Sequence, residues 1–149
     1  MTNHEICRHL RELAQLDYDA VRAYRQAVEQ VDLADIRDQL ALFENDHSQH
    51  IQNLSQIIIL LGGNAPEMKP DIDGVLLEGL TAMRSVTGTR GALGVMESSE
   101  KLTNKRYFEA TQLHLPADIK AQIALNFRDE QRHLQYVQQK VAEKVWQMR

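Results

Sequence analysis

The positions of proline and glycine constrain this 149-residue chain most strongly, because both residues disfavour the interior of a helix. The prolines are Pro66, Pro70 and Pro116, the first glycine is Gly62, and the last is Gly94. The chain before Gly62 and most of the chain after Gly94 are therefore free to form long helices. The sequence also lacks the Val/Tyr/Phe-rich alternation that is typical of strands, so we predict an all-α fold.

Apolar residues recur at steps of three and four along these blocks, which indicates helices with one buried face. The spacing predicts helices over residues 3–31, 33–61 and 90–114, and a fourth from the turn at residues 115–118 nearly to the C-terminus. A short break near Asp32 predicts an antiparallel hairpin, and Gly62-Gly63 predicts a C-cap. The long connection over residues 64–90, with a weaker helical stretch at 75–86, predicts a crossover that starts the third helix from the opposite end of a single-domain bundle (residues 1–149).

Ionisable side chains interrupt all four apolar faces at positions where a core residue is expected. Two of them form Glu-x-x-His pairs, a spacing that puts both side chains on one side of a helix. Several buried, uncompensated carboxylates would each cost on the order of several kcal/mol, so they are either protonated or neutralised by cations. Two divalent ions would balance four carboxylates, and a mixed nitrogen and oxygen ligand set suits iron or manganese. The candidate metal ligands are Asp17, Glu44, His47, Glu97, Glu100, Glu130 and His133.

The two halves of the chain repeat this pattern. Asp17 is followed by Tyr24 and then by the Glu44–His47 pair, whereas Glu100 is followed by Tyr107 and then by Glu130-x-x-His133. We therefore predict a duplicated hairpin whose halves pack with pseudo-twofold symmetry and present two equivalent half-sites to each other.

This arrangement resembles the ferritin-like superfamily, particularly bacterioferritin and the erythrin domain of rubrerythrin, over nearly the whole chain. The resemblance implies a ferritin-like antiparallel four-helix bundle that holds two iron ions, or manganese, with Glu44 and Glu130 as bridging ligands. It also implies oxidase, peroxidase or ferroxidase chemistry with O₂ or peroxide, in oxidative or metal stress. Asp17 departs from the glutamate usual in these families, which weakens the first metal position. No four-cysteine rubredoxin domain follows, so an electron donor would be external.

Several roles stay open at this point. Glu97 is the favoured ligand of its pair, and Glu100 is either a ligand or a carboxylate that shifts beside the metal. His50 is either a third nitrogen ligand or, in the favoured interpretation, a partly exposed polar neighbour. The tyrosines Tyr24 and Tyr107 either donate hydrogen bonds to the carboxylates or pack in the core.

Composition narrows the classes of partner. The formal net charge of −4 gives no general attraction to nucleic acid or to an anionic membrane. One cysteine, Cys7, excludes an intrachain disulfide framework, and the absence of a secretory-type apolar segment favours a cytoplasmic protein. We expect a homodimer.

Two functions other than redox chemistry at a metal centre remain open. They are iron storage in a cage and a metal-free helical interaction module.

Overall fold

The computed structural model describes residues 1–68 and 88–148, which form four long helices and no strand. The helices are α1 (Asn3–Gln30), α2 (Ala34–Leu60), α4 (Gly88–Thr111) and α5 (Ala117–Ala142), followed by a short 3₁₀ helix, η1 (Val145–Gln147). The predicted all-α bundle is confirmed, and the predicted helix bounds differ from the observed ones by only a few residues. The helical stretch predicted at residues 75–86 lies outside the described residues.

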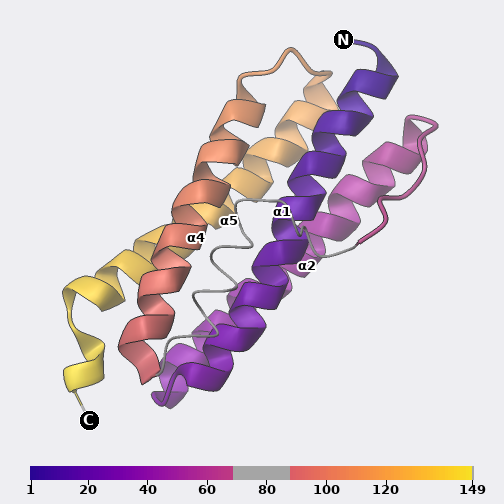
Figure 1. Cartoon of the computed structure of the whole chain (residues 1–149). Coiled ribbons are helices and arrows are strands. Elements are labelled where there is room, and N and C mark those ends of the chain that lie inside the picture. The colour runs from indigo at the N-terminus through magenta and orange to yellow at the C-terminus, as the bar shows by residue number, and fades with distance from the viewer. Residues whose placement is uncertain (69–87, 149) are drawn as a thin grey trace.

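The four helices form two antiparallel hairpins, α1 with α2 and α4 with α5 (Figure 1). α1 also packs along α4, whereas α2 and α5 share a less extensive contact. The end of α2 and the start of α4 lie at opposite ends of the bundle, so the predicted crossover is confirmed (Figure 1). The two hairpins therefore face each other with their inner surfaces, which is where the interrupted apolar faces meet.

Two apolar clusters fill the bundle, one toward each end. The first contains Leu40, Phe43, Leu93 and Met96 among others, and the second contains Leu10, Leu54 and Ile123 among others. On every long helix the ionisable residues fall between the stretches that supply these two clusters. The polar layer is therefore enclosed in the middle of the bundle, with apolar packing above and below it.

The helix ends explain why the elements begin and stop where they do. Thr2 and Glu5 form a reciprocal capping box at the start of α1. At the end of α2, Gly62 has a φ of +88°, and the Gly63 N–H donates to the carbonyl of Ile58 over 2.9 Å. The predicted glycine C-cap is therefore confirmed, because this conformation disfavours any side chain.

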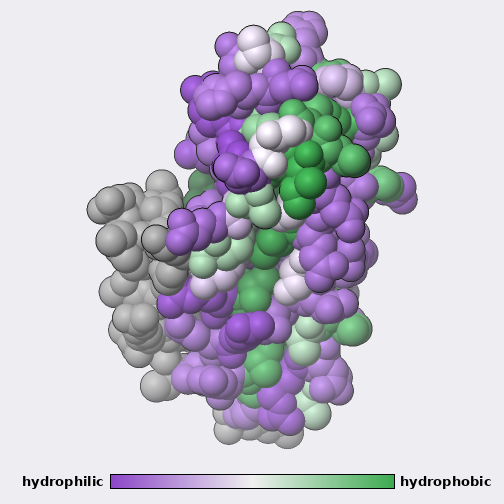
Figure 2. Space-filling model, turned by 90° about the vertical axis from the view of Figure 1, so that its right-hand side faces the viewer, coloured by the Kyte–Doolittle hydropathy of each residue, from purple (hydrophilic) through white to green (hydrophobic). Residues whose placement is uncertain are grey.

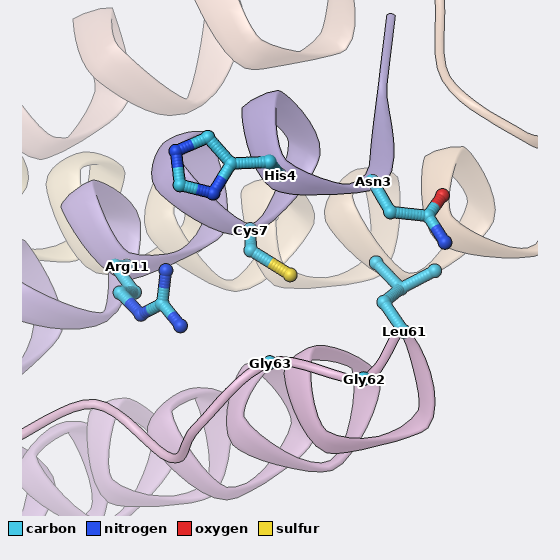
Figure 3. A pocket seen from close by; sticks show the side chains of 7 residues that line it. All are labelled: Asn3, His4, Cys7, Arg11, Leu61, Gly62 and Gly63. Carbon is cyan, nitrogen blue, oxygen red and sulfur yellow. The ribbon is translucent and has the colours of Figure 1, made fainter.

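The two glycines also bring the chain against the start of α1. Gly62, Gly63 and Leu61 line one side of a small pocket, opposite Cys7 and Arg11 (Figure 3). A Cβ atom on Gly63 would lie 3.0 Å from the sulfur of Cys7, so only glycine fits this approach without displacement. The pocket thus lies at the open end of the α1–α2 hairpin, where the start of α1 meets the end of α2.

The face seen in Figure 2 is mostly hydrophilic, with a hydrophobic stripe along it. Exposed large apolar side chains on α2 include Leu42, Ile59 and Leu60. None of the helices within residues 1–68 and 88–148 has the length and apolar character needed to cross a membrane. The expected homodimer stays a prediction.

Replacing Gly62 by alanine should destabilise the protein by about 1 kcal/mol, because an L-residue is strained at this positive φ. Chemical denaturation measures the change in the free energy of unfolding. Gly94→Ala is the matched control, since Gly94 lies within α4 with open space around it. The free energy of unfolding of that variant should rise by about 0.5–1 kcal/mol. Equal effects of the two substitutions would contradict the C-cap role of Gly62.

Candidate metal centre

The polar layer contains six carboxylate and histidine side chains that are at most 1% exposed. Each sits on the buried face of its helix, at a step of three or four from core residues of the same helix. All four long helices contribute, so the layer forms only when the two hairpins pack together. The six are Asp17 from α1, His47 and His50 from α2, Glu100 from α4, and Glu130 and His133 from α5.

These side chains form two overlapping groups of potential metal donors. One group is Asp17, His47, His50 and Glu130, and the other is His47, Glu100, Glu130 and His133. Within each group the donor atoms lie within 4.8 Å of one another. His47 and Glu130 belong to both groups, so the two clusters are neighbours that share side chains.

The structure brings five of the seven predicted ligands together and leaves two outside these groups. The half-buried Glu44 points to the outer side, where Oε2 lies 3.5 Å from Nε of the exposed Arg25. Its neighbour Phe43 takes the buried position on α2. Glu97 is likewise only partly buried, one turn before Glu100. The ligand roles of Glu44 and Glu97 stay predictions.

His50 is buried, so the favoured interpretation of a partly exposed neighbour is wrong. Its Nδ1 lies 3.0 Å from Asp17 Oδ1, inside the first donor group. A signal was present in the sequence, because His50 stands three residues after His47 and four before Leu54 on one helical face. The extra histidine changes the donor set from what the repeat alone predicted.

Tyr24 and Tyr107 each donate a hydrogen bond to a carboxylate of the opposite hairpin. The Tyr24 hydroxyl donates to Glu100 Oε1, and the Tyr107 hydroxyl donates to Asp17 Oδ2 over 2.5 Å. Both rings are fully buried, so the tyrosines also pack in the core. The exchange of equivalent bonds between the hairpins is the arrangement that a duplicated hairpin with pseudo-twofold symmetry predicts.

Two carboxylates at the surface hold the outer nitrogens of buried histidines. His50 Nε2 lies 2.8 Å from Asp129 Oδ2, and His133 Nε2 lies 2.8 Å from Asp46 Oδ2. Arg132 donates to both aspartates, over 2.9 Å to Asp46 and 3.1 Å to Asp129. The periodicity of α2 and α5 gave no sign of these partners, since the contacts arise only from packing between the two helices.

Two uncharged side chains fix α4 against α5 at the level of the site. Asn104 Nδ2 donates to the backbone carbonyls of Glu100 and Glu130, over 2.8 and 2.9 Å. The hydroxyl of Thr103 lies 3.0 Å from Glu100 Oε2 and 3.2 Å from Glu130 Oε2. These contacts hold the two carboxylates in register across the helix pair.

The charges of the layer are mutually compensating. Burial would lower the pKa of His50, but a hydrogen bond to Asp17 and attraction to Asp17 and Glu130 outweigh burial and raise that pKa to about 10. The pKa of His133 is raised to about 9, because Asp46 and the nearby Glu100 outweigh burial in the same way. These imidazoles are therefore protonated at neutral pH when no metal is bound.

The carboxylates respond in opposite directions. Burial would raise the pKa of Asp17 and Glu100, but the histidines around them lower both below the ordinary values. Burial raises the pKa of Glu130, with repulsion from Glu100 adding to the effect. Glu130 is thus the carboxylate whose charge the protein compensates least.

Two buried atoms lack a hydrogen-bond partner within the described part of the chain, Glu130 Oε1 and His133 Nδ1. An unsatisfied buried polar atom costs about 1–3 kcal/mol. Both atoms face the donor groups, and both are of the type that ligates a first-row divalent cation. The donor set therefore fits a metal site of mixed imidazole and carboxylate ligands.

A family model described as a domain of unknown function, DUF2383, matches residues 5–113, which is most of the chain. The chain belongs to the DUF2383 family. The matched residues include Asp17, His47, His50 and Glu100, whereas Glu130 and His133 lie beyond them on α5. No curated protein matches the chain.

The metal-free form of this DUF2383 protein should lose stability as the pH rises from about 6.5 to 10. His50 and His133 have folded-state pKa values of about 10 and 9, above the ordinary value of about 6.5. Their contribution is therefore complete below about pH 6.5 and disappears as the pH passes the folded values. The facing groups are Asp17, Glu130 and Asp129 for His50, and Asp46, Glu100, Glu130 and His47 for His133.

Denaturation with a chelator present, at pH values from 5 to 10, measures this loss, which we expect to be on the order of a few kcal/mol. Substitution of the exposed His114 by glutamine should leave the pH profile unchanged. A free energy of unfolding that stays constant from pH 6.5 to 10 would contradict charged imidazoles in the layer.

Proposed function

We propose that this chain is a ferritin-like protein that binds two divalent metal ions, iron or manganese, and reacts with O₂ or peroxide. The observation that carries the proposal is the position of Glu130 between the two donor groups. Its Oε1 lies 3.3 Å from Nδ1 of both His47 and His50, and its Oε2 lies 3.7 Å from Nδ1 of His133. One carboxylate thus presents an oxygen to each group, as a bridging ligand of a dinuclear centre does.

The topology and the order of the side chains support the ferritin-like assignment. Carboxylates come from α1 and α4, and histidines come from α2 and α5, with a crossover between the hairpins. Glu130 and His133 form a Glu-x-x-His pair on α5. The ligands from α1, α4 and α5 follow the pattern of the di-iron carboxylate bundles, whereas α2 contributes two histidines in place of a Glu-x-x-His pair.

In this proposal Asp17, His47, His50, Glu100, Glu130 and His133 hold the metals. Bound iron or manganese would supply the electrons that reduce O₂ or peroxide, and an external donor would return them. The tyrosine hydroxyls of Tyr24 and Tyr107 hold Glu100 and Asp17 in place. The two apolar clusters at either end of the layer limit the entry of water.

Metal binding should also release protons. A ligating imidazole is neutral, whereas the metal-free His50 and His133 are protonated at neutral pH because their pKa values are about 10 and 9. Metal affinity is therefore expected to rise with pH. Asp46 and Asp129, which are partly exposed, give the displaced protons a route toward solvent between α2 and α5.

Glu130→Ala should abolish binding of two ions, because it removes the oxygen atoms that both donor groups share. The test is anaerobic reconstitution with iron(II) or manganese(II), elemental analysis of metal per chain, and thermal unfolding with and without metal. At a free metal concentration of 100 times Kd, the unmodified protein should gain about 2.7 kcal/mol of stability. Glu109→Ala, at an exposed position of α4, is the control and should keep both ions.

Well under one metal ion per chain in the unmodified protein, with no change in melting temperature, would overturn the metal-binding function.

Glu44→Ala belongs in the same series of variants. A loss of metal in this variant would show that Glu44 leaves Arg25 to act as a ligand. The redox part has its own measurement. The loaded protein should consume peroxide or O₂, and the Glu130→Ala variant should consume neither above background.

A further inference from the structure

Besides the different placement of Glu44 and Glu130, the duplication of the hairpins is broken at two pairs of matched positions. The register that matches the Glu44–His47 pair with Glu130 and His133 also matches Phe43 with Asp129, and His50 with Tyr136. Under this register the polar pair of His50 and Asp129 therefore corresponds to the aromatic pair of Tyr136 and Phe43. If both half-sites were equivalent, these positions would carry the same chemistry.

The structure places both pairs between α2 and α5. His50 Nε2 lies 2.8 Å from Asp129 Oδ2. At the matching place, the rings of Phe43 and Tyr136 pack edge to face with their centres 5.3 Å apart. One half of the centre thus gains a buried imidazole held by a carboxylate, and the other half gains only apolar packing.

Four donor atoms of the first half converge on one point. Nδ1 of His47 lies 2.7 Å from Asp17 Oδ1 and 3.3 Å from Glu130 Oε1. Nδ1 of His50 lies 3.0 Å from the same Asp17 oxygen and 3.3 Å from the same Glu130 oxygen. Ligand atoms at tetrahedral positions about 2.0–2.2 Å from a cation lie about 3.3–3.6 Å apart. The two separations of 3.3 Å already fall in this range. A bound ion would move the atoms that lie 2.7 and 3.0 Å apart slightly away from each other.

His47 and His50 each place Nε2 beside a carboxylate of Glu100 or Asp129, so their Nδ1 atoms are available to a metal. His47 Nε2 lies 3.1 Å from Glu100 Oε1, and His50 Nε2 lies 2.8 Å from Asp129 Oδ2. A histidine ligand typically donates its second ring N–H to a carboxylate in this way, which fixes the orientation of the ring. Glu130 Oε1, buried and without a hydrogen-bond partner among the described residues, faces the same point.

We propose that Asp17, His47, His50 and Glu130 form a closed, four-coordinate site for one divalent first-row cation, and that this site fills before the second. The inference rests on the proposed metal-binding function and assigns different roles to its two positions. The second position retains only three protein ligands, Glu100, His133 and the other oxygen of Glu130, because His47 uses Nδ1 in the first. A site with three protein ligands would keep a coordination position open, which would be available to O₂ or peroxide.

Cobalt(II) tests this assignment without any activity measurement, since four-coordinate cobalt absorbs visible light much more strongly than six-coordinate cobalt. Titration of the metal-free protein should give an intense visible spectrum that is complete at one equivalent, followed by a second, weaker binding event. His50→Gln should lose the intense spectrum and bind the first equivalent at least 10-fold more weakly. His133→Gln is the matched control, because it removes the histidine of the open position and should keep the first equivalent intact.

The outcomes separate the two proposals. No cobalt bound by the unmodified protein would overturn both the metal-binding function and this site. Two ions bound with equal affinity, or a first equivalent unaffected by His50→Gln, would overturn the closed site alone. If His50→Gln fails to fold by circular dichroism, Asp129→Asn decides the question. That variant keeps His50 but removes its carboxylate partner, so the first equivalent should weaken by about 10- to 100-fold, and an unchanged affinity would overturn the proposal.

Discussion

The compensation of charge inside the bundle is the constraint on which the rest of this structure depends. Three carboxylates and three imidazoles are buried together between two apolar clusters. Each of them would be strongly unfavourable alone, because an isolated buried ion costs several kcal/mol even after relaxation. Since the six groups come from all four long helices, no helix can leave the bundle without breaking an ion pair of the layer.

The sequence predicted the architecture and the core of the site because both depend on positions along single helices. Pro66 and Gly62 marked the end of the first hairpin, and the apolar spacing located the buried faces. Asp17, Glu100 and Glu130 were recognisable as acids in otherwise apolar faces. The repeat of an acid and a tyrosine also predicted the symmetric pairing that the tyrosine hydrogen bonds now show.

The features that the sequence did not predict depend on rotation and packing. Phe43 and Glu44 are neighbours on α2, and a small rotation of the helix decides which of them faces the centre. The favoured interpretation of His50 is a partly exposed polar neighbour, whereas the packing of α2 against α5 buries it. The bonds from Asp46 to His133 and from Asp129 to His50 join different helices, so no pattern within one helix reports them.

The departures from symmetry matter more for function than the symmetry itself. A duplicated hairpin would produce two equal metal positions, and two equal positions offer an oxidant no preferred place to bind. His50 and Asp129 add a nitrogen donor and its support to one half, whereas Phe43 and Tyr136 keep the matching place apolar. In the proposed centre, one position would then anchor the metals while the other would stay open to an external ligand.

The presence of the polar layer is itself an argument for function over packing. Buried ion pairs replaced by well-packed apolar residues often leave a protein equally stable or more stable. The apolar clusters at either end show that this bundle packs well where no charge is present. A layer selected only for stability would therefore resemble those clusters. Glu130 instead keeps a buried oxygen without a hydrogen-bond partner inside the described chain, which is unfavourable until a cation binds it.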